Sequence, residues 1–344
     1  MSDLEKSRLL VLQSINLVLN QCHQALEDTE NLKIQNLSSE IENIVVPGMG
    51  GSAFTPDIVK SLFFEEIKLP YEILRSYHLP GYVNKRSLVI LSSYSGTTEE
   101  VLNCAEEAVE RGAKILVISC GGKLKELAKK YKWSGFFFEP KFNPSGQPRL
   151  GIGYMVCGHI GLLIKSGLIN LKFNKVKNSL KNIKNLDLIR KEAKNLALKL
   201  KNKFVILVAS SFLEGAVHGF ANQLNESAKT HSTYHFIPEL NHHRMEGLVF
   251  PREFKKTGIF LFYLSALYDP KIVVRFKITK NVIEKNGFEV LTNIPVGEKK
   301  IAQCFETILF NSYVSYYLAE LNEVDPIKIP WVDYFKEQLR KVEK

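Results

Sequence analysis

The feature that most constrains the fold is a repeated unit of an apolar run, a short polar turn and a helical pattern. In the clearest example, Ser87–Leu91 is apolar after its first residue, which predicts a buried parallel strand. Glu99–Glu110 follows, with apolar residues at helical spacing. The turn between them is crowded with hydroxyl groups, from Ser93, Ser95, Thr97 and Thr98.

This hydroxyl-rich turn is a candidate anion site. Gly96 frees the backbone, and the helix that follows directs unpaired N–H groups and a partial positive charge at the turn. A phosphate monoester is the simplest ligand for such an arrangement. The turn is not a nucleotide P-loop, because the G-x-x-x-x-G-K-[ST] spacing and its lysine are absent. An ordinary capped helix explains the same residues, and the turn alone does not decide between the two.

The same unit recurs along the chain. Ile41–Pro47 runs into Gly48-Met-Gly-Gly-Ser52 and a helix, and this turn lacks the third glycine of a dinucleotide-binding G-x-G-x-x-G loop. Lys114–Ile118 and, after a Lys- and Asn-rich stretch over 167–202, Phe204–Ala209 begin further units. Strand and helix in alternation predict an α/β protein whose parallel sheets lie between helices, with ligands at the carboxyl ends of the strands.

This pattern predicts two domains. The N-terminal domain covers residues 1–165 and begins with a leading helix over residues 5–26. The C-terminal domain covers residues 166–344 and ends with a helix near Trp331–Lys341. We expect one long helix within 167–202 to connect them.

Composition excludes several classes of function. The chain has 344 residues, 45% of them hydrophobic and 24% charged, as in a globular protein, and it has no apolar run long enough for a membrane helix. Its five cysteines are scattered without C-x-x-C spacing, which favours reduced thiols, and no leader pattern is evident, so we expect a cytoplasmic protein. The net charge of +10 is spread along Lys-rich helices without a nucleic-acid recognition module, which favours a solvated basic surface.

A few polar residues stand out beyond the turns. Arg149 precedes an apolar helix, where it either reaches an anion or is an ordinary surface residue. Glu226 lies late in a largely apolar helix and is either a general base or a solvated carboxylate. Glu239-Leu-Asn-His-His243 suggests an acid/base group. His231 and His235, four residues apart, are only a weak indication of a metal site.

Six short motifs then occur in one order from about residue 40 to the end: Gly48-Met-Gly-Gly-Ser52, Ser93-Tyr-Ser-Gly-Thr-Thr98, Pro148-Arg149, Gln223-Leu-Asn-Glu226, Glu239-Leu-Asn-His242, and Asp325-Pro326 with Asp333-Tyr-Phe-Lys336. Together they resemble the bifunctional phosphoglucose/phosphomannose isomerases, a branch of the sugar-isomerase-domain (SIS) superfamily. The resemblance implies two SIS domains, each an αβα sandwich with a parallel sheet, in a homodimer. It also implies interconversion of glucose 6-phosphate or mannose 6-phosphate with fructose 6-phosphate, without metal or cofactor.

The resemblance assigns roles to particular residues. Arg149 would stabilise charge on the enediol intermediate, and Glu226 would move a proton between carbons 1 and 2. His242, from the partner subunit, would assist ring opening, and Lys336 would also serve ring chemistry. The phosphate site would comprise Gly51, Ser52, Ser93, Ser95 and Thr98.

The sequence departs from the family pattern in places that bear on substrate preference. Thr97 replaces a frequent Asn, His243 stands where Asn is usual, and Ile327 stands where Thr is common. Two alternatives use the same fold. A non-catalytic phosphosugar-binding SIS regulator is disfavoured because Arg149, Glu226 and His242 are all present. The isomerase half of a glucosamine-phosphate synthase lacks support, since no N-terminal nucleophilic Cys or glutaminase domain is evident.

Overall fold

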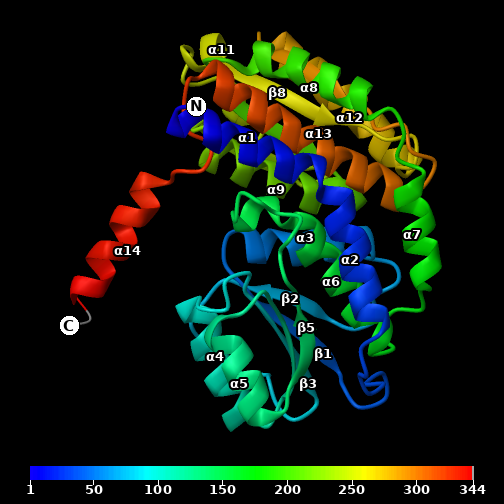
Figure 1. Ribbon diagram of the computed structural model, residues 1–344. Coiled ribbons are helices and arrows are strands. Elements are labelled where there is room, and N and C mark those ends of the chain that lie inside the picture. Colours follow the sequence, from blue (N-terminus) through cyan, green and yellow to red (C-terminus); the bar gives the residue numbers. More distant parts are fainter. Residues whose placement is uncertain (343–344) are drawn as a thin grey trace.

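The computed structural model of the protein describes residues 1–342 and contains two parallel β-sheets, one in each half of the chain (Figure 1). The first sheet has the strand order β2-β1-β3-β4-β5 and the second β7-β6-β8-β9, with every neighbouring pair parallel. The first sheet comprises β1 (Asn43–Pro47), β2 (Tyr71–Leu74), β3 (Ser87–Ser92), β4 (Lys114–Ser119) and β5 (Ser134–Phe137). The second comprises β6 (Phe204–Ala209), β7 (Ser232–Phe236), β8 (Gly258–Tyr263) and β9 (Glu289–Asn293). The predicted α/β class with two helix-flanked parallel sheets is confirmed.

Helices connect successive strands except between β2 and β3, where residues 75–86 form turns, because parallel neighbours need crossover connections. The N-terminal half contains α1 (Asp3–Asn16), α2 (Val18–Glu30), α3 (Gly51–Leu62), α4 (Glu99–Glu110), α5 (Gly122–Tyr131), the 3-10 turn η1 (Pro148–Leu150) and α6 (Ile152–Lys165). The C-terminal half contains α7 (Phe173–Lys181), α8 (Leu186–Leu200), η2 (Ser211–Leu213), α9 (Glu214–Glu226), α10 (Leu240–His243), η3 (Glu246–Leu248), α11 (Phe254–Thr257), α12 (Pro270–Lys285), α13 (Lys300–Leu321) and α14 (Pro330–Val342).

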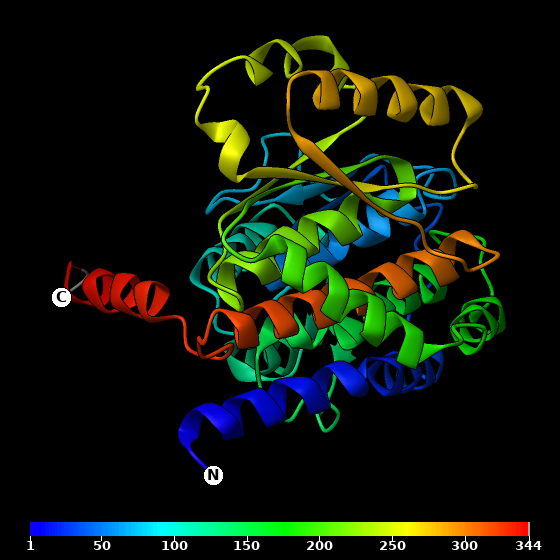
Figure 2. The same ribbon diagram turned by 90° about the horizontal axis from the view of Figure 1, so that it is seen from above.

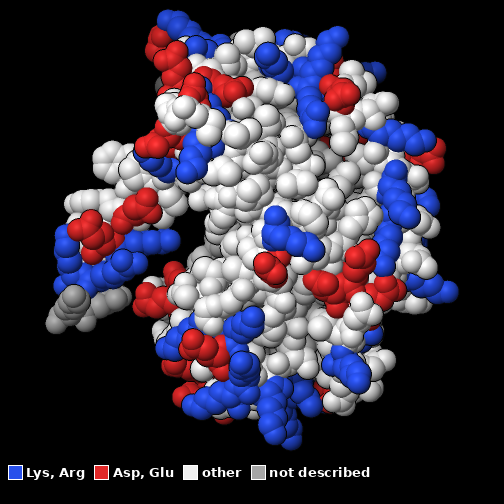
Figure 3. Space-filling view, in the orientation of Figure 1, with Lys and Arg blue, Asp and Glu red and all other residues white. Residues whose placement is uncertain are grey.

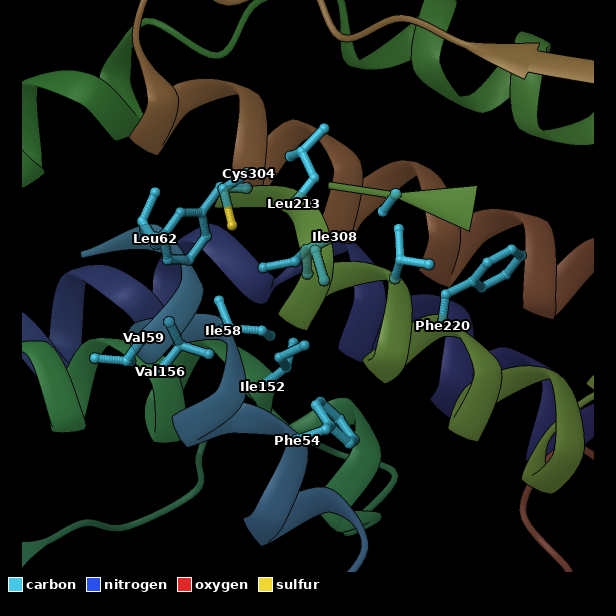
Figure 4. Close-up of a cluster of buried hydrophobic side chains, with 14 of the residues drawn as sticks. Phe54, Ile58, Val59, Leu62, Ile152, Val156, Leu213, Phe220, Cys304 and Ile308 are labelled. Atoms are coloured by element: carbon cyan, nitrogen blue, oxygen red, sulfur yellow. The ribbon is translucent and has the colours of Figure 1, made fainter. Parts of the chain in front are cut away.

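A single large hydrophobic core joins the two halves. Side chains of α3 and α6 meet those of η2, α9 and α13 in its centre (Figure 4): Phe54, Ile58, Val59, Leu62, Ile152, Val156, Leu213, Phe220, Cys304 and Ile308. The N-terminal helix α1 lies along α13, so the start of the chain also packs on the C-terminal half. The domain division between residues 165 and 166 stays a prediction, and residues 343–344 of the second domain lie outside the described residues.

Two expected long helices are each divided. The helix predicted over residues 5–26 is wrong as one element, because the backbone leaves helical geometry at Leu17 (φ −97°, ψ 5°). The helix predicted within 167–202 is also wrong as one element. Asn185 adopts left-handed geometry (φ 59°) between α7 and α8, a conformation that Asn tolerates better than most residues.

Several short strands and helices of the structure were not predicted from the sequence. The strand β5 is four residues long and opens with Ser134-Gly135, so it had no expectation from the sequence. The segment from Glu239 to Thr257 holds α10, η3 and α11, which are three or four residues long. Patterns this short carry no periodicity to detect.

The last helix, α14, projects from the body, and none of its described residues is buried. Figures 1 and 2 show it standing clear of both sheets. In the space-filling view, acidic and basic side chains alternate around the rim of the face shown, and its centre is largely uncharged (Figure 3). Within residues 1–342, no helix is both long and apolar enough to cross a membrane.

Candidate active site

The two Gly- and Ser-rich turns meet at the carboxyl edge of the first sheet, because β1 and β3 are adjacent and parallel. Ser92 Oγ donates a hydrogen bond to the Ser52 carbonyl (2.8 Å), and the Tyr94 N–H donates to Ser52 Oγ (2.9 Å). Gly51 and Ser52 open α3, and the turn Ser93–Thr98 leads into α4. We call these two turns, Gly48–Ser52 and Ser93–Thr98, the clamp.

The hydroxyl groups of the clamp are paired with one another. Ser93 Oγ lies 2.7 Å from Thr98 Oγ1 and accepts from the Gly96 N–H. Ser95 Oγ lies 3.0 Å from Thr97 Oγ1 and accepts from the Thr97 N–H. The five predicted phosphate-site residues thus lie in two adjoining turns, and Thr97 pairs with one of them, Ser95.

A third turn supports the clamp from the other side. The turn between β4 and α5 places the Gly121 carbonyl where a side chain on Gly96 would lie, since an added Cβ would meet this oxygen at 1.9 Å. The Leu124 N–H donates to the Gly96 carbonyl, and the Cys120 N–H donates to the Tyr94 carbonyl. Gly96 also has φ +70°, so glycine is needed both for the backbone and for this close approach.

Arg149 lies directly beside the clamp. A Cβ on Gly51 would approach the Arg149 nitrogen and the Pro148 carbonyl carbon at 3.3 Å, so η1 packs on the start of α3. The guanidinium itself is only 2% exposed. Burial lowers the pKa of Arg149, and the neighbouring Glu226 carboxylate opposes this effect.

Every N–H of the guanidinium has an acceptor. Nε donates to Ser227 Oγ (2.9 Å), and Nη1 donates to Gln147 Oε1 (3.0 Å) and to Glu226 Oε2 (3.1 Å). Nη2 donates to the carbonyls of Pro326 (2.6 Å) and Ile327 (3.0 Å). Five donors meet five acceptors, as a buried arginine requires.

Glu226 closes α9, and its side chain is 28% exposed, so one of its faces is open to a ligand while the other holds Arg149. Gln223, one turn earlier, donates to the Arg149 carbonyl and to Ser312 Oγ. These contacts connect the clamp of the first half, through Gly51 and Arg149, to the end of α9 in the second half. Arg149 and Glu226, to which the resemblance gives separate roles, are thus in direct contact.

Lys229 holds the loop that supplies two acceptors to Arg149. Its Nζ donates to the carbonyls of Glu226, Asp325 (3.0 Å) and Lys328 (2.6 Å). Burial, and then the charge of Arg149, lowers the pKa of Lys229 to about 8. The loop 325–328 is thus held by two cations through its backbone.

His242 and Lys336 are not brought to this cluster within one chain. His242 lies on α10 and Lys336 on α14, both are exposed, and neither side chain forms a hydrogen bond or ion pair within residues 1–342. His231 precedes β7 and His235 lies within it. In the described part of the chain, no group of three or more His, Cys, Asp or Glu side chains is arranged to hold a metal ion.

Known proteins similar to this chain account for this arrangement. Residues 189–339 match the family "Bacterial phospho-glucose isomerase C-terminal SIS domain". A bifunctional phosphoglucose/phosphomannose isomerase of Caldicellulosiruptor bescii is 33% identical, over 96% of this chain and 99% of its own length. The chain belongs to the bifunctional phosphoglucose/phosphomannose isomerase family.

Two further comparisons give another relative and a solved structure of the same fold. A protein of the same description from Aquifex aeolicus is 29% identical over 87% of this chain and 91% of its own length. The crystal structure of tagatose-6-phosphate ketose/aldose isomerase from Escherichia coli shares the fold, with a TM-score of 0.70 at 14% identity over 93% of this chain and 95% of that one.

Within this family fold, the departure at residue 327 has a simple structural reading. Ile327 contributes its backbone carbonyl to Arg149, so this contact does not depend on whether Thr or Ile occupies the position. His243 forms an exposed ion pair with Glu239 at 3.4 Å, one turn away on the same helical segment.

Sequence reasoning missed the residues that position Arg149. Gln147 and Ser227 lie next to two of the six motifs, but Gln and Ser are common residues that do not by themselves indicate a site. The backbone carbonyls that bind Arg149 cannot be recognised from a sequence. Lys229 was counted only as one of many lysines. A buried arginine needs about five hydrogen-bond acceptors. Polar residues close to the motifs in the sequence are therefore candidates for the partners of Arg149.

Proposed function

We propose that this chain is an aldose–ketose isomerase that interconverts glucose 6-phosphate, and also mannose 6-phosphate, with fructose 6-phosphate. The observation that carries this proposal is the contact between Arg149 and Glu226 immediately beside the clamp. A phosphate held at one end of an open-chain sugar fixes the reacting carbons relative to these two side chains. A cytoplasmic location stays a prediction.

In the proposed reaction, the Glu226 carboxylate removes the proton from C2 of the open-chain aldose. The C2–H electron pair forms the C1–C2 double bond of an enediol, and the carbonyl oxygen gains a proton. Glu226 then returns its proton to C1 while the O2–H bond breaks and the carbonyl re-forms at C2. The proton released from O2 replaces the one that O1 gained, so no external oxidant or reductant is consumed.

Arg149 stabilises the developing oxyanion through its positive charge, because all five of its N–H groups are already bound to acceptors of the chain. These bonds keep the guanidinium fixed during the reaction. Gly51, Ser52, Ser93, Ser95 and Thr98 hold the phosphate.

Ring opening needs a further acid and base, which we assign to His242 and Lys336. Because neither reaches Arg149 or Glu226 within one chain, we propose a homodimer in which His242 enters the site of the partner. No metal ion or cofactor is needed for these steps.

The test is a coupled assay of purified protein with fructose 6-phosphate, glucose 6-phosphate and mannose 6-phosphate. We expect turnover by the native chain and its loss in Glu226→Gln, whose amide oxygen still accepts from Arg149 but cannot take a proton. In D2O the native chain should place deuterium at C2 of the aldose product, because the base exchanges its proton with solvent.

Glu192→Gln is the matched control, since Glu192 is exposed on α8 and forms no ion pair within residues 1–342. Normal turnover in Glu226→Gln would show that another group is the base. Binding of sugar phosphates without turnover by the native chain would support the phosphosugar-binding regulator instead.

A further inference from the structure

Four consecutive backbone carbonyl groups of the loop 325–328 accept hydrogen bonds from two cations. The two inner carbonyls, at residues 326 and 327, accept from Arg149. The two outer carbonyls, at residues 325 and 328, accept from Lys229 Nζ at 3.0 and 2.6 Å. Removing either cation would leave two carbonyls without their partner, so the shape of the loop depends on both cations.

The side chain of Asp325 binds the N–H groups of the same loop. Its Oδ1 accepts from the N–H groups of Ile327 (2.8 Å) and Lys328 (3.3 Å), as in an Asx turn. Its Oδ2 accepts from Ser7 Oγ (3.1 Å) on α1. The carboxylate thus takes two N–H groups of the loop, while the loop carbonyls are left for the two cations.

Lys229 binds the end of α9 with the same ammonium group. Its third hydrogen bond runs from Nζ to the Glu226 carbonyl (2.5 Å). A lysine ammonium has three protons, and all three therefore have acceptors. Because Glu226 is the base of the proposed function and the loop binds Arg149, one ammonium fastens together the supports of both side chains.

The same loop leads directly into α14. Pro330 begins this helix two residues after Lys328, and Lys336, which the proposed function assigns to ring opening, lies on it. None of the described residues of α14 is buried, and Figure 1 shows the helix leaving the body directly after the loop. The direction of α14 is therefore set by the loop, and so by the cations that hold the loop.

We propose that Lys229 is a positioning residue of the isomerase reaction, whose ammonium holds the loop 325–328 in place and thereby fixes Arg149 relative to Glu226. All three of its partners are backbone carbonyls, so it acts through other residues and not on the substrate. This inference rests on the proposed function, which assigns the chemistry to the groups that Lys229 positions. A misplacement of about 1 Å at such groups can lower a rate ~100-fold.

The alternative is an ordinary solvated lysine, because Lys229 lines an open hollow of about 600 Å³ just beyond the ends of α8, α9 and α13. Lys203 lines the same hollow and also donates to a backbone carbonyl, that of Lys256 (3.1 Å). It forms no hydrogen bond with the loop 325–328. Lys203 therefore provides a matched control for the loss of one ammonium from this surface.

The test is the coupled assay at pH 7. Burial, and then the charge of Arg149, lowers the pKa of Lys229 to about 8, so the ammonium is mostly protonated under these conditions. Lys229→Met keeps an unbranched side chain but donates no hydrogen bond. We expect its kcat to fall roughly tenfold or more, with KM for fructose 6-phosphate changed less than about threefold, because Lys229 forms no hydrogen bond with the clamp. Lys229→Arg keeps the charge and donors and should restore most of the kcat.

Hydrogen exchange followed by mass spectrometry measures the loop itself, without any substrate. We expect faster exchange over residues 325–332 in Lys229→Met, and native rates in Lys229→Arg and Lys203→Met. Lys203→Met should also keep the native kcat. Lys229 has φ 53°, and its two variants have unbranched side chains, so backbone strain is similar in all three.

Asp325→Ala is a second variant, because it loosens the same loop from the other side and leaves Lys229 unchanged. We expect the same signature, a lower kcat together with faster exchange over residues 325–332. If Lys229→Met does not fold, Asp325→Ala decides. A native kcat in Asp325→Ala despite faster exchange would show that the position of the loop does not matter for the reaction.

The inference and the proposed function fail in different ways. An active native chain with an equally active Lys229→Met would overturn the inference alone. A lowered kcat without faster exchange of the loop would contradict it too, as would an equal loss in Lys203→Met. Absence of turnover by the native chain would instead refute the proposed function.

Discussion

Arg149 shows at the residue scale how a side chain becomes fixed in one place. Its five donors reach acceptors on α9, on the loop before η1 and on the loop 325–328, and the guanidinium is buried. A lysine at this position has at most three donors and cannot satisfy the same set. The geometry of the site therefore depends on arginine in particular and not on positive charge alone.

Glu214, a partly buried carboxyl group at the start of α9, gives a prediction about pH. Burial raises the pKa of Glu214 to about 7, and the Ser211 N–H and Lys60 oppose this while Asp57 adds to it. Between pH 4.5 and 7 the unfolded chain ionises this carboxyl while the folded chain keeps it protonated. Stability therefore falls as the pH rises through this range.

Glu214→Gln removes this penalty, because the amide stays neutral and still accepts from Ser211. We expect the variant to be more stable than the native chain by roughly 1–2 kcal/mol above pH 7, with the difference vanishing near pH 4.5. Urea unfolding at several pH values measures this. Equal stability differences at all pH values would contradict the assignment, and Glu192→Gln should show no pH-dependent difference.

The sequence identified individual site residues better than it identified their partners. Glu226 and Arg149 were singled out by their motifs, yet no pattern in the sequence links residues 77 positions apart. The acceptors from Pro326 and Ile327 are backbone atoms, which every residue possesses. Their role arises only from tertiary packing.

At the scale of elements, the clamp depends on the close approach of two turns. Gly96 and Gly122 face one another, and a Cβ on Gly122 would meet the Ser95 carbonyl at 2.4 Å. A Cβ at either glycine could be accommodated only if the backbone of the facing turn moved, because the atoms that would collide belong to that backbone. The turn between β4 and α5 thus sets the shape of the turn that holds the phosphate in the proposed function.

Gly96→Ala should separate these turns. We expect a KM for sugar phosphates raised at least tenfold and a stability loss of roughly 2–4 kcal/mol, from the collision with the Gly121 carbonyl together with the strained φ. Gly112→Ala is the control, since Gly112 has φ +65° but an added Cβ would only touch Lys85 at 4.0 Å. Equal losses in both variants would show that strain alone, and not the clamp, is responsible.

Sequence patterns predicted most elements of ordinary length. Glu99–Glu110 and Phe204–Ala209 were predicted from helical spacing and from an apolar run, and both ranges match the observed elements. The failures are places where local backbone choice decides, such as the break at Leu17 and the left-handed Asn185. The spacing of apolar residues does not reveal a single residue whose backbone departs from helical geometry.

At the scale of the whole molecule, the crossing of α3 and α9 joins the two halves. A Cβ on Gly215 would meet the Ile58 nitrogen at 2.3 Å, so these helices approach backbone to backbone at this point. The helix α3 begins at the clamp, and α9 ends at Glu226. The distance between phosphate and base in the proposed function is thus set by how closely the two helices pack.

Gly215→Ala should force the helices apart. We expect a stability loss of roughly 2–4 kcal/mol and a fall in kcat larger than any rise in KM, because the clamp stays intact while Glu226 shifts relative to it. Gly247→Ala provides the control, since nothing lies within 4 Å of an added Cβ there. A rise in KM with unchanged kcat would instead place the damage in the clamp.

The acceptor set of Arg149 also determines when this site can first exist. Its guanidinium needs partners from residue 147 through residue 327. A nascent chain on the ribosome can fold the first sheet early, but Arg149 remains incompletely paired until the loop 325–328 has been synthesised and has docked. Proteolytic fragments that lack this loop should likewise have no assembled site. Activity therefore appears only after nearly the entire length has been translated, and no partial product can carry it.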